Sequence, residues 1–452
     1  MPVERVDVVV IGAGAAGLAA AEHLARANLT VRVLEARPRI GGRVDTRHLP
    51  GWPVPVELGA EFVQGRARTL LARVRKARLR VEPTGEKRLT LKDGRLTDVE
   101  PLLQGALSRV AALHGDVPVE QALEAMERNE KIPAEERALS RFYVEGYYAA
   151  DVTRASAEAI GTLERASRAL HGDEAARVEG GYIGVLDHIL ASMEKRAPGA
   201  LRLSTVVTEV RWSAGRVMVE SRKAAGPSLP QLEARAAVVT IPLGVLRAPV
   251  GAAGAIRFAP RLHDVERAAA SMVQGPLFKL LFRFRQAFWR SGTPSARHAR
   301  LRDFGFAFLP GGAVPTWWTT APVESGVLTG WAGGPLAQEL SALPPDSWRG
   351  RALDTLQRLF GTPRPRLEEL LDDELMHDWQ ADPYARGGYA VTQVGGLGAA
   401  RVLARPVADT LFFAGERTHT EGQAGTVHGA LETGERAAGE CVGALRKGAR
   451  ER

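Results

Sequence analysis

Residues 6–35 read VDVVVIGAGAAGLAAAEHLARANLTVRVLE, and this stretch decides the fold. The β-branched run Val6–Ile11 is typical of a strand buried on both faces of a sheet. Ala15–Ala27 is rich in strong helix formers and ends at Asn28, and Thr30–Glu35 reads as a second buried strand. The order strand, helix, strand predicts a βαβ unit, and therefore a parallel sheet with a right-handed crossover.

The turn between the first strand and the helix fits the pattern G-x-G-x-x-G. Gly12 permits a tight turn, Gly14 lets the backbone approach a pyrophosphate, and Gly17 lets the helix pack closely on the strand. The free N–H groups at the start of the helix favour phosphate. Glu35, 23 residues after Gly12, would accept hydrogen bonds from ribose hydroxyls. The context predicts a dinucleotide site, and a purely structural glycine turn is the weaker alternative.

The rest of the chain divides into segments of different pattern. Residues 100–180 show helical spacing of apolar residues, and residues 201–220 read as a hairpin that turns at 213–215. Residues 236–241 and 410–414 are further buried strands, and a long helix is expected over 425–445. The two ends of the chain should join in one sheet, with the middle of the chain supplying an inserted second domain.

Length and composition bound the class of protein. The 452 residues suggest about three domains as a soft prior. Hydrophobic residues make up 45% and charged residues 25%, which excludes wholesale disorder. The one cysteine, Cys441, cannot form an internal disulfide or a zinc cluster, so it is expected to be a buried small residue and no metal site is predicted.

The formal net charge is +8, which by itself suggests an acidic partner. The eight lysines and 52 arginines are scattered along the chain, so a compositional bias toward arginine is favoured over a basic nucleic-acid-binding face. The apolar stretch Val8–Ala21 is broken by glycines and is too short to span a membrane. With no signal peptide visible, a cytoplasmic location without a membrane partner is expected.

Three ordered segments resemble one known family. Residues 35–43, EARPRIGGR, resemble the E-A-x-x-R-x-G-G-R segment of the FAD-dependent amine oxidase superfamily. Residues 56–65 resemble the E-L-G-A-x-x-V-x-G segment of polyamine oxidases and lysine-specific histone demethylases. Residues 411–416 and 425–430 resemble the family's F-A-G-E and V-H-G-A signatures. Smaller matches are Gly180–Tyr182, Val207 and Thr240–Leu246.

This resemblance implies an α/β fold: a Rossmann-like FAD-binding domain of the GR2 type, with an inserted α+β substrate-binding domain. The implied FAD domain is discontinuous and takes residues 1–80, 181–268 and 382–452, and the substrate domain takes 81–180 and 269–381. The resemblance assigns FAD binding to Gly12, Gly14, Ala15, Ala16, Gly17, Glu35, Ala36, Arg37, Gly42, Arg43, Gly59, Ala60, Glu61, Phe62, Val207, Trp379, Gly415, Glu416, Gly425, Thr426 and Val427.

Two residues are implied to be catalytic. Lys279 lies in the apolar run 277–284, where a charge needs a reason. It matches the family lysine that holds a water near flavin N5. The alternative is a lysine on the solvent face of an edge strand. Tyr389 matches one wall of an aromatic cage whose opposite wall matches Thr426. Gly388 stands where some monoamine oxidases attach FAD through cysteine, so non-covalent FAD is expected. His428 is expected to be a packed helix residue.

The substrate is less well defined by the sequence. Gln64 stands where polyamine oxidases carry a carboxylate, while Glu61 lies three residues earlier. The expected substrate pocket consists of Glu61, Gln64, Tyr389 and Thr426. Glu421 is a further candidate. The arginine that amino-acid oxidases often carry near Glu61 is missing, which makes a carboxylate-bearing substrate the weaker expectation.

The sequence therefore predicts an amine oxidase that transfers hydride from the amine α-carbon to flavin N5, gives an imine and reduces O2 to H2O2. An L-amino-acid oxidase or desaturase on the same fold is one alternative, and a basic flavoprotein that acts as a binding module is another. The expected partners are a small amine and oxygen, and a homodimer stays open.

Overall fold

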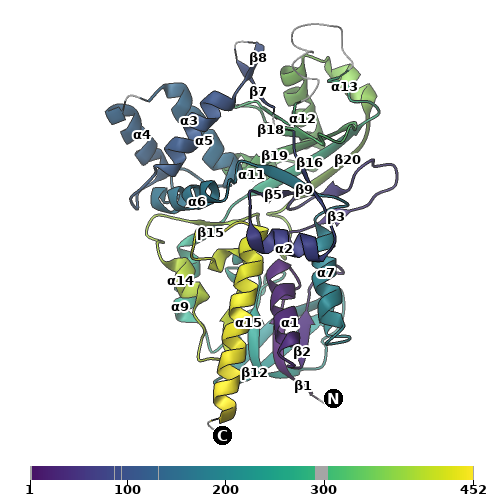
Figure 1. The fold of residues 1–452 in the computed structure, drawn as a ribbon, viewed down its shortest axis with the longest axis vertical. Coiled ribbons are helices and arrows are strands. Elements are labelled where there is room, and N and C mark those ends of the chain that lie inside the picture. The colour runs from purple at the N-terminus through teal and green to yellow at the C-terminus, as the bar shows by residue number, and fades with distance from the viewer. Residues whose placement is uncertain (1–2, 86, 93, 131, 291–303, 451–452) are drawn as a thin grey trace.

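The computed structural model describes residues 3–85, 87–92, 94–130, 132–290 and 304–450. The molecule is elongated, with both chain termini at the same end (Figure 1). A large sheet with covering helices forms the half that carries the termini. A second sheet and a group of helices form the other half.

The predicted βαβ unit is present at the centre of the large sheet. Strand β1 (Glu4–Ile11) lies parallel to β2 (Val31–Leu34) on one side and to β13 (Leu232–Val239) on the other, with α1 (Ala15–Arg26) between β1 and β2 in the chain. The strand order is β10 (Leu201–Arg202), β2, β1, β13, β12 (Arg216–Lys223), β11 (Thr205–Ser213) and β14 (Arg257–Ala259), and β22 (Leu411–Phe413) also pairs with β13.

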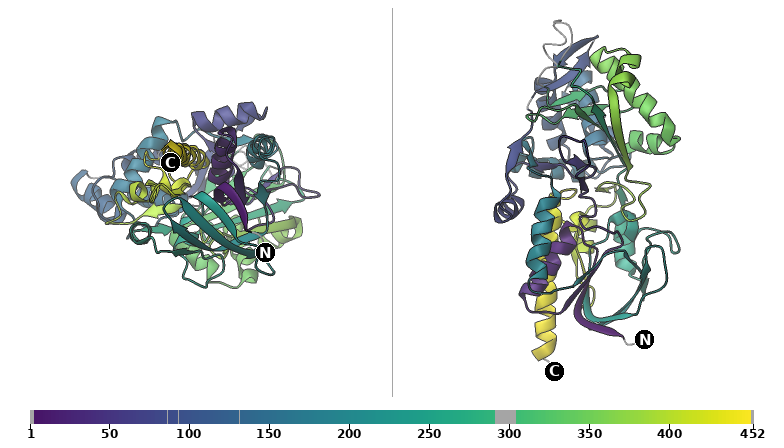
Figure 2. Two further views of the ribbon diagram at one scale, coloured as in Figure 1. Left: turned by 90° about the horizontal axis from the view of Figure 1, so that it is seen from below. Right: turned by 90° about the vertical axis from the view of Figure 1, so that its right-hand side faces the viewer.

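Helices cover one face of this sheet, because β1 is apolar on both sides. Val8, Val9 and Val10 are all 0% exposed. The layer consists of α1, α7 (Ile183–Glu194) and the long α15 (Val427–Arg450), which lie side by side in Figures 1 and 2. A side chain at Gly434 would meet the Ala16 carbonyl oxygen at 2.2 Å, so α15 packs on α1 backbone to backbone.

The opposite face packs against the β11–β12 hairpin region and small helices. These are α8 (Leu243–Leu246), α9 (His263–Ala270) and α14 (Ala399–Ala404). The predicted hairpin and its turn are confirmed. The predicted strand 236–241 is shifted: it begins at Leu232 and ends at Val239, because Thr240 instead caps the neighbouring turn by donating from Oγ1 to the Ile11 carbonyl.

The second sheet forms the core of the other half. Its central strand β16 (Leu277–Phe284) pairs with β19 (Val327–Gly333) and β20 (Leu371–Asp378). The full strand order is β20, β16, β19, β18 (Thr316–Thr319), β17 (Phe306–Phe308), β7 (Arg88–Lys92) and β8 (Arg95–Asp98). Three helices pack against this sheet: α11 (Gly334–Ser341), α12 (Pro345–Phe360) and α13 (Arg364–Leu370).

The helical region predicted for residues 100–180 is present as far as Ala169, but Ala175–Val178 form a strand, β9, because they pair with strands on either side. The helical region contains α3 (Glu100–Ala111), α4 (Val119–Glu130), α5 (Ala134–Tyr147) and α6 (Ala157–Ala169). The two halves are joined by helix α2 (Arg68–Lys76), the 3-10 turn η1 (Glu416–Thr418) and three small sheets. In the first small sheet, β9 (Ala175–Val178) pairs with β5 (Phe62–Gln64) and β6 (Val81–Pro83). The other two pair β3 (Thr46–Arg47) with β4 (Val56–Glu57), and β15 (Met272–Gln274) with β21 (Ala390–Thr392).

Two kinds of feature are absent from the described residues. None of their helices combines the length and the apolar character that crossing a bilayer requires. They also contain no group of three or more His, Cys, Asp or Glu side chains that could hold a metal ion.

Candidate active site

A cavity of about 600 Å³ lies where the two halves of the molecule meet. Its walls come from the large sheet, the second sheet and the helical region. With the exceptions of Gly17 and Glu421, it is lined by every residue that the sequence assigned to cofactor, catalysis or substrate. Residues from segments as far apart as Gly12 and Val427 therefore share one cavity.

The glycine turn forms one end of this cavity. Gly12 has φ +104°, a backbone conformation that favours glycine. Gly17 lies behind the wall, where an added Cβ would meet the Gly12 carbonyl oxygen at 1.9 Å. Helix α1 starts after Gly14 without a side-chain cap and without an acidic residue in its first turn. Its first N–H groups are therefore available to an anion.

Glu35 lies beside the glycine turn and is 4% exposed. Its Oε2 accepts a hydrogen bond from Ala13 N at 2.8 Å, and its Oε1 accepts one from Arg37 N at 2.9 Å. A carboxylate oxygen can accept a second bond, so both oxygens keep capacity for hydroxyl groups in the cavity. This arrangement fits a ribose diol.

Two arginines of the EARPRIGGR segment line the cavity as members of ion pairs. Arg37 Nη2 lies 2.8 Å from Asp382 Oδ2, and Arg43 Nη1 lies 2.9 Å from Glu416 Oε1. Arg43 also donates to the Gly388 carbonyl. Burial by itself raises the pKa of Asp382, but the neighbouring His377 ring, whose Nε2 lies 3.7 Å away, and the charge and hydrogen bonds of Arg37 lower the pKa overall. These pairs fix both guanidinium groups beside the cavity.

The start of α15 forms another part of the wall. Thr426 caps this helix: its Oγ1 accepts from Gly429 N at 3.0 Å and donates to the Gln423 carbonyl at 2.7 Å. Gly425 N donates to Glu416 Oε2 at 3.1 Å. The first turn of α15 carries no acidic residue of its own, so the positive end of the helix that faces the cavity is offset only by Glu416 from η1.

Lys279 lies at the centre of a buried polar cluster. It is 0% exposed, and β16 is an interior strand, so the edge-strand alternative is wrong. Lys279 Nζ donates to Glu61 Oε2 at 2.8 Å and to the Gly59 carbonyl at 3.2 Å, and lies 5.2 Å from the Trp318 ring centroid. An ammonium has three protons, and two are used in these bonds, so the third is free for a group in the cavity.

The other side of Glu61 is also occupied. Its Oε1 accepts from Arg177 Nε at 2.8 Å and from Trp318 Nε1 at 3.0 Å. Burial alone raises the pKa of Glu61, but the charges of Lys279 and Arg177 and their hydrogen bonds lower it to about 2. The structure thus gives Glu61 internal partners, and its carboxylate is not left free for a substrate ammonium, contrary to the expectation from sequence.

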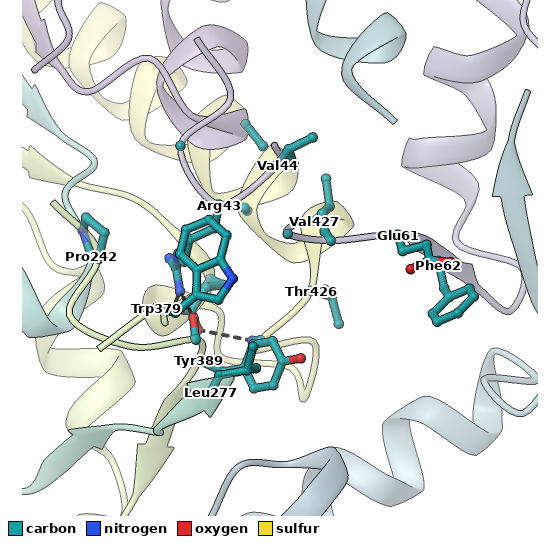
Figure 3. Close-up of a pocket in the computed structure, with 18 of the residues that line it drawn as sticks. Arg43, Val44, Glu61, Phe62, Pro242, Leu277, Trp379, Tyr389, Thr426 and Val427 are labelled. Carbon is teal, nitrogen blue, oxygen red and sulfur yellow. Dashed lines mark hydrogen bonds and ion pairs between the residues drawn. The ribbon is translucent and has the colours of Figure 1, made fainter. Parts of the chain in front are cut away.

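Aromatic side chains line the remaining wall. Tyr389 stacks on Trp331, with ring centroids 6.4 Å apart and planes inclined by 28°. Trp379 is 2% exposed and donates from Nε1 to the Leu58 carbonyl at 3.0 Å. Figure 3 shows Trp379 and Tyr389 near one another, and both belong to the same apolar cluster as Leu277. Burial raises the pKa of Tyr389, which keeps its hydroxyl neutral.

The other predicted residues separate into two groups. Gln64 lines the cavity. Glu421 is exposed and does not line it, so the prediction that Glu421 belongs to the pocket is wrong. His428 is 4% exposed and bonds to Gln423 Oε1 at 2.7 Å, as expected of a packed helix residue, and burial lowers its pKa to about 4. Cys441 is 0% exposed, as predicted.

Several cavity residues were missed by the sequence reasoning. They lie outside the recognisable motifs and come together only through packing of the second sheet and the helices. Trp318 belongs to the doublet Trp317–Trp318 and Tyr147 to the doublet Tyr147–Tyr148, and these doublets were the available signal. The missed residues include Tyr143, Tyr147, Glu164, Trp318 and Trp331, and Arg177 was missed as the partner of Glu61 behind the wall.

The cavity fits FAD on the evidence of its own residues. A glycine cradle and the uncapped start of α1 suit a pyrophosphate, and Glu35 suits a ribose diol. The aromatic wall and Lys279 then lie at the end where a flavin ring would be accommodated. These features define the class of protein as a dinucleotide-dependent flavoprotein. Bound FAD supplies the hydride acceptor.

The comparisons with known proteins agree. The chain belongs to the family of flavin containing amine oxidoreductases, whose model matches residues 15–442. The chain is 27% identical to "Polyamine oxidase 1" of Oryza sativa subsp. japonica, over 99% of both chains. It is 26% identical to "Lysine-specific histone demethylase 1 homolog 3" of Arabidopsis thaliana, covering 99% of this chain but 31% of that protein. Its cofactor is FAD, and its reaction is the oxidation of an amine.

Solved structures show the same fold. Putrescine oxidase bound to putrescine matches with a TM-score of 0.78 at 20% identity, over 98% of this chain and 100% of that one. Cyclohexylamine oxidase from Brevibacterium oxydans IH-35A matches with a TM-score of 0.78 at 22% identity, over 98% and 99%. The predicted fold, a Rossmann-like FAD domain with a substrate domain, is thereby confirmed.

Proposed function

We propose that the chain oxidises a primary or secondary amine with non-covalently bound FAD and passes the electrons to O2. The amine loses a hydride from the carbon next to nitrogen and a proton from nitrogen, and water hydrolyses the resulting imine to an aldehyde or ketone. Dioxygen takes up two electrons and two protons and becomes H2O2. The observation that carries this proposal is the buried Lys279 in the wall of an aromatic cavity.

Lys279 is assigned the oxygen side of the reaction. Its third N–H bond is not used by the protein and is free to hold a water or a reduced oxygen species. A fixed positive charge in a site shielded from solvent stabilises negative charge that develops on oxygen. Gly59 and Glu61 hold the ammonium in place.

Tyr389 and Trp331 are assigned to the amine. Their stacked rings offer an apolar surface to the carbon next to nitrogen, while the neutral Tyr389 hydroxyl adds no charge. The amine must lose its own proton before oxidation, and an apolar aromatic surface favours the neutral form. Thr426 is assigned to the helix cap and the cofactor side of the cavity instead of an opposite cage wall.

Non-covalent FAD is supported by the position of Cys441. It is the one cysteine in the sequence, is 0% exposed within α15, and is not among the residues that line the cavity. A cysteinyl link to flavin is therefore not available. The domain limits given above and the cytoplasmic location stay predictions.

Amino-acid oxidation is the weaker candidate. Among the cavity-lining arginines, Arg37, Arg43 and Arg88 are each paired with a carboxylate. Arg168 lines the cavity too, but its side chain is exposed and donates to Ser108 Oγ at 3.2 Å. No buried and unpaired arginine in the described part of the cavity is left to hold a substrate carboxylate.

The test uses the purified yellow protein. Acid precipitation should release all flavin into the supernatant. Oxygen uptake should follow addition of amines, with one H2O2 formed per O2 consumed. Oxygen uptake with L-amino acids alone would favour the second candidate. Flavin that stays with the precipitate would contradict non-covalent binding.

A further inference from the structure

One buried arginine beside the cavity has no acidic partner. Arg417 belongs to η1 and is 1% exposed. Its Nη1 donates to the Ile241 carbonyl, whereas its Nε and Nη2 are buried without a hydrogen-bond partner among the described residues. Within the same part of the chain, no carboxylate oxygen lies within 4.0 Å of its guanidinium group.

The other two arginines that are buried in the described residues have carboxylate partners. Arg37 is paired with Asp382, and Arg73 with Glu22. An arginine that is buried without a carboxylate is costly, because its charge is removed from water and no opposite charge replaces the lost hydration. Burial lowers the pKa of Arg417 to about 10, which still leaves the side chain charged at neutral pH. An anion that binds nearby would reduce this cost.

Arg417 lies directly behind the cavity wall. Its Nη1 is bonded to Ile241, which lines the cavity, and a Cβ on Gly415, another lining residue, would meet the same nitrogen at 3.1 Å. Gly415 adopts φ +116° and has no side chain that would thicken the wall. Thr240, next to Ile241 in the chain, contacts the glycine turn, since a Cβ on Gly12 would meet its Oγ1 at 2.7 Å. The charge of Arg417 is therefore behind the part of the wall that adjoins the phosphate cradle.

The other charges at this end of the cavity do not favour an anion by themselves. Among the described residues, the charged groups that line this end or pair with a lining group are Glu35, Arg37, Arg43, Glu416 and Asp382. Carboxylates outnumber arginines in this set, whereas each phosphate of the FAD diphosphate brings a further negative charge. Arg417 offsets the excess, because a charge acts strongly through a thin layer of low dielectric constant.

We propose that Arg417 is an electrostatic determinant of FAD binding: it compensates the negative charge of the cofactor's diphosphate through the cavity wall, without lining the cavity itself. The folded apoprotein bears the cost of the buried charge, and binding of the cofactor reduces it. This role of Arg417 does not depend on which amine is oxidised.

The test measures the affinity for FAD and the stability of the flavin-free protein separately. Arg417→Met replaces the guanidinium by an apolar side chain and should raise the dissociation constant of FAD by about 10-fold or more. The same variant should leave the unfolding midpoint of the apoprotein unchanged or raise it, because a buried unpaired charge is removed. Equilibrium dialysis and denaturant titration give the two values. A purely structural role predicts the opposite result, a lower apoprotein midpoint with unchanged affinity for FAD.

Two further variants separate charge from shape. Arg417→Lys keeps the charge and should bind FAD within about threefold of the wild type, whereas Arg417→Gln should lose affinity like the methionine variant. This pair decides the question if Arg417→Met does not fold, and equal affinities of the pair would reject the role of charge. Arg73→Met is the matched control, since Arg73 is also buried but its charge is already compensated by Glu22 and Glu435. The control should lower the apoprotein midpoint and leave the affinity for FAD unchanged.

ADP tests the assignment to the diphosphate, because ADP carries a diphosphate but no flavin. In calorimetric titrations of the apoprotein, Arg417→Met should weaken the binding of ADP and of FAD by factors that agree within about threefold. A loss of affinity for FAD alone would overturn the assignment to the diphosphate. Equal affinities of the wild type and Arg417→Met for FAD would overturn the whole role of Arg417. Neither measurement uses an amine, so the proposed oxidation stands or falls independently.

Discussion

Lys279 and Glu61 form an ion pair, with Nζ 2.8 Å from Oε2, in which the lysine side chain is 1% exposed and the carboxylate 8%. The pair lies in the cavity wall, and the third proton of the ammonium is available to a group in the cavity. Arg177 holds the other oxygen of Glu61. The position of Lys279 therefore depends on a carboxylate that is itself fixed from two sides.

Replacing Lys279 with methionine should slow reoxidation of the reduced enzyme by oxygen by about 100-fold, because the fixed charge beside the reacting oxygen is lost. The FAD content should stay unchanged. Stopped-flow mixing of reduced enzyme with oxygenated buffer gives the rate. Lys447→Met, at the exposed end of α15, is the control and should reoxidise like the wild type. An unchanged rate in Lys279→Met would refute the role assigned to this lysine.

Glu61→Gln should lower the free energy of unfolding by about 3–5 kcal/mol, because it leaves Lys279 and Arg177 buried beside a neutral amide. Denaturant titration measures this loss. The half-exposed carboxylate Glu266, paired with the exposed Arg261, supplies the control, since Glu266→Gln should cost less than about 1 kcal/mol. A Glu61→Gln variant as stable as the wild type would mean that the cluster adds nothing to folding.

The same variant should change the pH dependence of stability. The folded-state pKa of Glu61 is about 2, below its ordinary value of 4.5. A depressed pKa contributes stability that is present above about pH 4.5 and is lost as the pH falls toward 2. The difference in unfolding free energy between wild type and Glu61→Gln should therefore shrink between pH 5 and pH 2.5. A constant difference over this window would contradict the depressed pKa.

Gly17→Ala should destabilise the protein and reduce its FAD content. Its Cβ would meet the Gly12 carbonyl oxygen at 1.9 Å, so α1 must move away from β1 and take the phosphate cradle with it. Thermal unfolding and flavin absorbance per protein check this. Gly439→Ala in α15 has no atom within 4 Å of the added carbon and should be neutral or stabilising by up to about 1 kcal/mol. Similar losses in both variants would rule out the steric cause.

Glu35→Ala should weaken FAD binding by about 10- to 100-fold, since it removes a buried charged acceptor for hydroxyl groups and frees Ala13 N and Arg37 N. Equilibrium dialysis of the apoprotein against FAD gives the dissociation constant. Glu421→Ala, on an exposed loop, is the comparison and should bind FAD like the wild type. If both variants bind alike, Glu35 does not contact the cofactor.

The fold and the cofactor end of the site were predictable because local pattern determines them. The run Val6–Ile11, the glycine turn and Glu35 are adjacent in sequence, and their spacing alone places a helix start against a parallel sheet. The substrate end was not predictable in this way. Whether Glu61 is free or paired depends on Arg177, which lies more than a hundred residues away in the sequence.

The central claim, amine oxidation at a flavin in this cavity, is tested most directly by anaerobic titration of the purified holoenzyme. The account predicts that amines bleach the flavin absorbance, that L-amino acids do not, and that admitting oxygen restores the colour with formation of H2O2. A flavin that no amine bleaches, or that only amino acids bleach, would contradict it.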